Sequence, residues 1–149
     1  MKWTRIYSAQ IGANANFANG LRDIVIRCLA DNETPPLVTQ DAELCLAEVF
    51  NNFVEHGLEE RPYIEISIFV KTTPTARRFL LLDTGRQVPC DAYRMACMPE
   101  IDHQVPADFP EGGFGLALVK MLAERFLYRR VGGLNVTFLE FCTPKNEQT

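Results

Sequence analysis

The stretch LAEVFNNFVEHG, residues 46–57, combines an apolar helical stripe with a line of polar side chains. Glu48, Asn52 and His56 are each four residues apart, so they lie along one edge of a helix predicted from about Thr39 to His56. The predicted buried stripe of this helix is Ala42, Cys45, Leu46, Val49, Phe50 and Phe53. Gly57 stands where a left-handed C-terminal cap belongs. A carboxylate can orient or deprotonate a hydroxyl, and a carboxamide can ligate Mg²⁺, although a plain solvated face has the same pattern.

The second informative stretch is LLLDTGRQVP, residues 80–89. Asp83 follows an apolar strand, which places a carboxylate at the rim of a sheet where it can accept a hydrogen bond from an exocyclic amine such as that of adenine. Gly85 would let the backbone come close to a flat ring. An ordinary Asp-x-Gly turn is the competing interpretation, because these residues are common in turns.

The third stretch is EGGFGLALVKML, residues 111–122, in which three glycines lead into an apolar helix. Backbone amides at the positive end of a helix suit phosphate oxygens. The stretch is not a P-loop, because no Gly-Lys-Ser/Thr follows, and Leu118 replaces the third glycine of a dinucleotide-binding fingerprint. A flexible hinge into a core helix is the alternative.

The remaining pattern predicts an α+β domain. The predicted elements are a strand in the first dozen residues, a helix from about Asn14 to Ala30 that is stopped by Pro35-Pro36, strands over Ile64–Val70 and Arg77–Asp83, a helix from near Gly115 to about Phe126, and two closing strands joined by Gly132-Gly133. We therefore expect a two-layer α/β sandwich with helices on one face of a mixed, mostly antiparallel sheet.

Composition narrows the class of protein. The 149 residues fit one domain, 47% are hydrophobic, 23% are charged, and the formal net charge is −4. Without a block of cations, direct nucleic-acid binding is disfavoured. The five cysteines are odd in number and lack C-x-x-C spacing, which indicates reduced thiols. No leader sequence or membrane-spanning run is evident, so we expect a cytoplasmic protein without membrane attachment.

The three stretches together resemble the N, G1 and G2 boxes of the GHKL ATPase superfamily. E-x-x-x-N lies on a helix, D-x-G follows a strand and G-G-x-G-L precedes a helix, in that order. The chain is most similar to the bacterial anti-sigma-factor serine/threonine kinases, over roughly residues 6 to 142. The resemblance implies the Bergerat, or histidine-kinase-like ATPase, fold as a single ATP-binding domain over residues 1–149, with a lid at about 86–112.

The resemblance also implies roles for individual residues. Asn52 would hold Mg²⁺ against the triphosphate of ATP, and Glu48 would be the catalytic base. Asp83 would bind the adenine amino group, with Gly85 making room for the ring. The phosphate contacts would come from Gly113, Gly115 and the amide of Leu116. His56 is expected to cap or pack. Lys120 is expected to be a solvated surface residue, with a phosphate contact as the alternative.

The function implied by the resemblance is regulatory. An anti-sigma-factor kinase phosphorylates an antagonist protein on serine or threonine and sequesters a sigma factor. The resemblance is also compatible with a homodimer, in which Phe17, Leu21 and Val25 of the first helix would belong either to the core or to the interface. Gln87 stands where many superfamily members have a second glycine in the G1 box. The alternative is accordingly a catalytically silent module whose partner binding is gated by nucleotide.

Overall fold

The structure is a computed structural model that describes residues 2–12, 36–88 and 114–143. The described elements are β1 (Thr4–Gly12), α2 (Pro36–Asn52), the π-helical turn η1 (Phe53–Gly57), β2 (Tyr63–Thr72), β3 (Ala76–Asp83), α4 (Phe114–Leu122), β4 (Arg125–Val131) and β5 (Leu134–Cys142). The helix predicted at 14–30, with its proposed dimer residues, and the lid segment from residue 89 onward lie outside the described residues.

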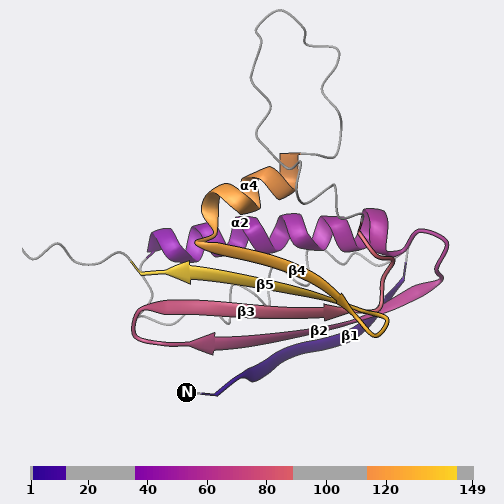
Figure 1. The fold of residues 1–149 in the computed structure, drawn as a ribbon, viewed down its shortest axis with the longest axis horizontal. Coiled ribbons are helices and arrows are strands. Elements are labelled where there is room, and N and C mark those ends of the chain that lie inside the picture. Colours follow the sequence, from indigo (N-terminus) through magenta and orange to yellow (C-terminus); the bar gives the residue numbers. More distant parts are fainter. Residues whose placement is uncertain (1, 13–35, 89–113, 144–149) are drawn as a thin grey trace, which may run out of the picture.

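A five-stranded sheet in the order β1-β2-β3-β5-β4 forms one layer, and α2 and α4 lie together on one face of it (Figure 1). The fold is therefore α+β, as predicted. All four strand pairings among the described residues are antiparallel. The strand β3 is central, with β2 on one side and β5 on the other, so its last residue is enclosed by neighbours on both sides.

The hydrophobic core lies between the helices and the sheet. Every residue of the stripe predicted for α2 is buried, namely Ala42, Cys45, Leu46, Val49, Phe50 and Phe53. The sheet contributes alternate residues of each strand, because successive side chains of a strand point to opposite faces. Ile64, Ile66 and Ile68 of β2 and Phe79 and Leu81 of β3 supply the centre of this face.

The C-terminal end of the long helix differs from the prediction. The α-helix ends at Asn52, and the π-helical turn η1 carries the chain on to Gly57. Gly57 does not adopt a left-handed conformation, so the predicted glycine cap is wrong; Glu60, at φ 61°, is the left-handed residue after the helix. Gly57 instead packs against Ile64, since a Cβ at this position would lie 3.4 Å from Ile64 Cδ1.

The helix predicted to reach Phe126 ends earlier, at Leu122. The amide of Glu124 leaves the helical pattern and donates to the carbonyl of Glu140 at 2.8 Å, which starts the pairing of β4 with β5. Phe126 consequently belongs to β4. Gly132 and Gly133 close the β4–β5 hairpin at φ 53° and 81°, the paired left-handed conformation that a tight hairpin turn requires.

The two described cysteines have different surroundings. Cys45 is buried in α2, and burial, with the nearby charges of Asp41 and Glu48, raises the pKa of its thiol to about 12. Cys142 is exposed, and neither of these two forms a disulfide.

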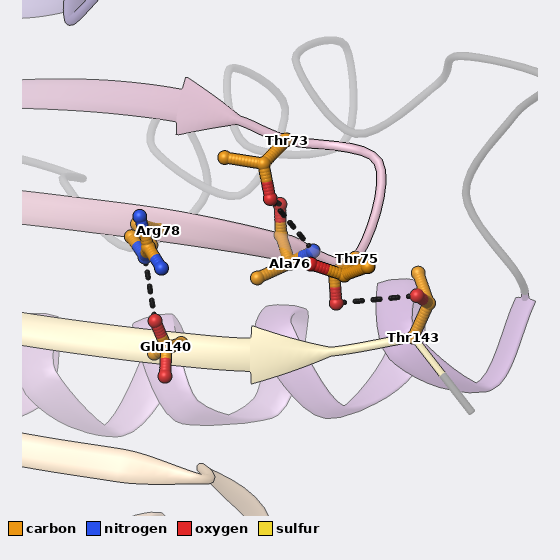
Figure 2. A network of polar contacts seen from close by, with 6 residues as sticks. All are labelled: Thr73, Thr75, Ala76, Arg78, Glu140 and Thr143. Atoms are coloured by element: carbon orange, nitrogen blue, oxygen red, sulfur yellow. Dashed lines mark hydrogen bonds and ion pairs between the residues drawn. The ribbon is translucent and has the colours of Figure 1, made fainter. Parts of the chain in front are cut away.

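A polar network stabilises the end of the sheet that lies opposite Asp83 (Figure 2). The amide of Ala76 donates to Thr73 Oγ1 at 3.0 Å in the turn between β2 and β3, and the amide of Thr143 donates to the carbonyl of Thr75 at 2.9 Å. Arg78 Nε pairs with Glu140 Oε2 at 2.5 Å between β3 and β5. These contacts hold the central strands in register while leaving the opposite end of the sheet for a site.

Truncation of the buried centre should destabilise the domain strongly. Leu81 is 0% exposed, so Leu81→Ala should lower the free energy of unfolding by about 2–5 kcal/mol through lost burial and a residual cavity. Leu44→Ala on the exposed side of α2, where Leu44 is 50% exposed, should change it by about 0.5 kcal/mol or less. Urea unfolding of both variants measures the difference; equal losses would contradict the assigned core.

Candidate functional site

Asp83 ends the central strand, and its side chain is enclosed by the two strands beside it. Its register partners are Ile66 on β2 and Asn135 on β5, and the residue is 2% exposed. Its Oδ1 accepts hydrogen bonds from the Gly85 amide at 2.9 Å and from Asn135 Nδ2 at 2.8 Å. The carboxylate predicted at the rim of the sheet is thus a buried and oriented acceptor.

Burial is the largest influence on Asp83 and raises the pKa of its carboxyl group above the ordinary value. The hydrogen bonds from Asn135 and Gly85 and the charges of Arg130 and Arg61 act in the opposite direction. A carboxylate removed from water in this way interacts strongly with any donor that reaches it.

The turn after Asp83 is packed against the end of η1. A Cβ on Gly85 would lie 2.7 Å from Asp83 Oδ1 and 3.0 Å from Gly57 Cα, so no larger residue fits without moving backbone. The amide of Arg86 donates to the carbonyl of Gly57 at 3.1 Å. Gly85 therefore has a role within the protein, which is to let two backbone segments meet beside the carboxylate.

Asn135 connects this turn to the β4–β5 hairpin. Besides Asp83, its Nδ2 donates to the carbonyls of Gly85 at 3.1 Å and Arg86 at 3.0 Å. Its Oδ1 accepts from the Tyr128 hydroxyl at 2.5 Å and from Arg130 Nη1 at 2.9 Å. The asparagine is 2% exposed, and these contacts use both ends of its amide.

Sequence reasoning missed Asn135, Tyr128 and Arg130. A signal was present, since Asn135 and Thr137 have the same parity as Leu139 and Phe141 and so face the core in β5. Polar residues at inward positions of a strand need partners, and that need marks them as members of a site.

The polar line of α2 approaches the start of α4. A Cβ added to Gly115 would collide with Glu48 Oε2, so the glutamate carboxylate lies directly against the first turn of α4. Asn52, one helical turn later, is half-buried. The third stretch thus meets the first one through a glycine that allows close approach of the helices.

One cleft joins residues of all three stretches. Its empty volume is about 340 Å³, a figure that includes space open to solvent. Its lining residues are Val49, Asn52, Phe53, Gly57, Asp83, Arg86, Val88, Leu116, Tyr128, Asn135 and Thr137. Asn52, Asp83 and Leu116 therefore converge as predicted from the sequence. Glu48, Gly85 and Gly115 are not among the residues that line it.

The other predicted residues are placed as follows. Gly113 lies outside the described residues. His56 has a side chain 53% exposed, so it does not pack in the core, and its carbonyl accepts from the Glu59 amide at 3.3 Å. Lys120 is exposed on α4. Among the described helices, none is both long and apolar enough to cross a membrane.

Residues 12–141 match the sequence model of the histidine kinase-like ATPase domain. The chain belongs to this family. No protein with a curated description matches the chain in sequence. As a histidine kinase-like ATPase domain it is an ATP-binding protein, and the cleft between α2, α4 and the end of β3 is its candidate nucleotide site.

The raised pKa of Asp83 predicts how this ATPase domain responds to pH. Because its pKa is raised in the ligand-free protein, folding favours the protonated form of the Asp83 carboxyl group. The stabilising contribution of this group is complete below its pKa in the unfolded chain, near 3.8, and is lost as the pH rises through the raised native pKa. Relative to Asp83→Asn, the wild type should therefore gain stability as the pH falls from 7 through that window. Urea unfolding of both proteins over a pH series tests this, and a pH-independent difference would contradict it.

Proposed function

We propose that the chain is an ATP-dependent serine/threonine protein kinase that phosphorylates an antagonist of an anti-sigma factor and, in an alternative complex, sequesters a sigma factor. The observation that carries the proposal is the convergence of Asn52, Asp83 and the start of α4 on one cleft. The resemblance of the three sequence stretches to those kinases supports the protein class, and the family supports the use of ATP.

The nucleotide would lie with its base at the end of β3 and its phosphates near α4. Asp83 would accept a hydrogen bond from the adenine amino group through Oδ2, because the two hydrogen bonds from Gly85 and Asn135 both go to Oδ1. Gly85 would keep the turn close, and the phosphates would meet amides at Gly113, Gly115 and Leu116.

The surroundings of Asn52 fit a magnesium ion that is shared with the nucleotide. Asn52 lines the cleft with a carboxamide oxygen, and Mg²⁺ in such sites uses one or two protein oxygens together with phosphate oxygens and water. When bound, Mg²⁺ would neutralise charge on the β- and γ-phosphates. Asn52 would hold it one helical turn along α2 from Glu48.

Glu48 would act as the catalytic base. The serine hydroxyl oxygen of the antagonist would bond to the γ-phosphorus while the bond from phosphorus to the β–γ bridging oxygen breaks, so ADP leaves and the hydroxyl proton passes to the Glu48 carboxylate. The added phosphate, with nearly two negative charges, would then weaken the complex with the antagonist.

Transfer of ³²P from labelled ATP tests this role. Proteins that co-purify with the chain are identified, purified singly and incubated with the wild type, Glu48→Gln and the control Glu124→Gln, which changes an exposed residue between α4 and β4. We expect serine phosphorylation of one partner by the wild type and the control, and a rate about 10²–10⁴-fold lower with Glu48→Gln. Equal rates for all three proteins would overturn the assigned role.

The position of Glu48 favours a second candidate. Its carboxylate lies against Gly115 and is not among the residues that line the cleft, an arrangement suited to joining α2 and α4. The chain would then be a nucleotide-gated binding module without transferase activity. Mg-ATP at 100 times its dissociation constant would still stabilise the fold by about 2.7 kcal/mol, but no partner would be labelled and partner affinity would differ between ATP and ADP.

A further inference from the structure

Three side chains of the β4–β5 hairpin reach across to the turn that follows β3. Tyr128 and Arg130 lie on the edge strand β4, and Asn135 lies on β5, opposite Arg130 in one register pair and Asp83 in another. We propose that Tyr128 and Asn135 are positioning residues that set the base specificity of the nucleotide site by fixing the orientation of the Asp83 carboxylate. The proposal rests on the placement of adenine at Asp83.

The directions of the hydrogen bonds in this cluster are determined by its members. The Val88 amide donates to the Tyr128 oxygen at 3.1 Å, so the tyrosine proton is available for Asn135 Oδ1. Arg130 can only donate, and it donates to the same Oδ1. Two donors thus hold the carbonyl end of the Asn135 amide, and its NH₂ end must face Asp83.

This orientation has a consequence for the carboxylate. Asp83 Oδ1 receives both the Asn135 and the Gly85 hydrogen bonds, which fixes the plane of the group inside a buried site. Neither bond uses Oδ2, and a deprotonated carboxylate oxygen can only accept. A base that presents an amino group at this point is therefore favoured over one that presents a carbonyl oxygen or no polar group, since the buried acceptor would then be unpaired.

The same chain of bonds extends from Asp83 to the backbone at residue 88. Val88 and Tyr128 both line the cleft, and Arg130 Nη1 also donates to the Gly85 carbonyl at 2.8 Å. The edge strand β4 thereby braces the turn over residues 85–88 from one side, while Gly57 braces it from the other. Loss of the tyrosine hydroxyl should loosen Asn135 first and Asp83 through it.

Base discrimination is measured as the ratio of the dissociation constants of two nucleotides, and general destabilisation of the fold would not change this ratio. The dissociation constants of ATP and of purine riboside 5′-triphosphate, which lacks the amino group, are measured by calorimetry for the full chain, Tyr128→Phe, Asn135→Leu and the control Tyr63→Phe. Tyr63 is a matched tyrosine at the start of β2, 53% exposed, and it pairs with Gly12 on β1. Tyr128→Phe removes one hydroxyl only, so it keeps the test valid should Asn135→Leu fail to fold.

We expect the wild type and Tyr63→Phe to prefer ATP by at least about tenfold. Asn135→Leu should bring the ratio of the two constants close to one, and Tyr128→Phe should lower it several-fold, in both cases mainly by weakening ATP. Variants that weaken both nucleotides by the same factor, or a Tyr128→Phe ratio equal to that of the wild type, would overturn the proposal.

Two further results would separate this inference from the proposed function. A wild type that binds ATP and the analogue equally would overturn the positioning role together with the adenine contact, while leaving nucleotide binding intact. A wild type that binds neither would overturn the proposed function itself, and this inference with it.

Discussion

The hydrogen bond from Asn135 Nδ2 to Asp83 Oδ1 is the contact on which the site depends. A carboxylate that is 2% exposed is costly to bury unless its oxygens are satisfied, and this bond, with that from the Gly85 amide, offsets part of the cost. The pair also joins the central strand to its neighbour β5 at the end where the cleft opens. Stability and ligand recognition therefore share the same few atoms.

Much of the fold follows from local pattern. Alternation in β2 and the helical stripe of α2 each predict which face is buried, because periods of 2 and 3.6 are visible within a single element. The residues at which helices end are harder to predict from the sequence than the buried faces are. Gly57 looked like a cap but serves close packing against Ile64 and Gly85, and Glu124 leaves α4 because its amide finds a partner on β5.

Part of the site could likewise be predicted from the sequence, and part could not. Asp83, Asn52 and Leu116 were identifiable from short motifs, and they do line one cleft. The approach of Glu48 to Gly115 and the bond from Asn135 to Asp83 join residues 67 and 52 positions apart, so no local window contains both partners. Such contacts are determined by the order of strands in the sheet and the packing of helices, which short-range pattern does not specify.

The proposed roles of these residues depend on a nucleotide that occupies the cleft at the end of β3 with its base at Asp83. A crystal structure of the chain with Mg²⁺ and a non-hydrolysable ATP analogue measures this directly. We predict the adenine amino nitrogen within hydrogen-bond distance of Asp83, about 2.7–3.2 Å, and the phosphates at the first turn of α4. A nucleotide bound elsewhere, or one whose base lies away from Asp83, would contradict the account.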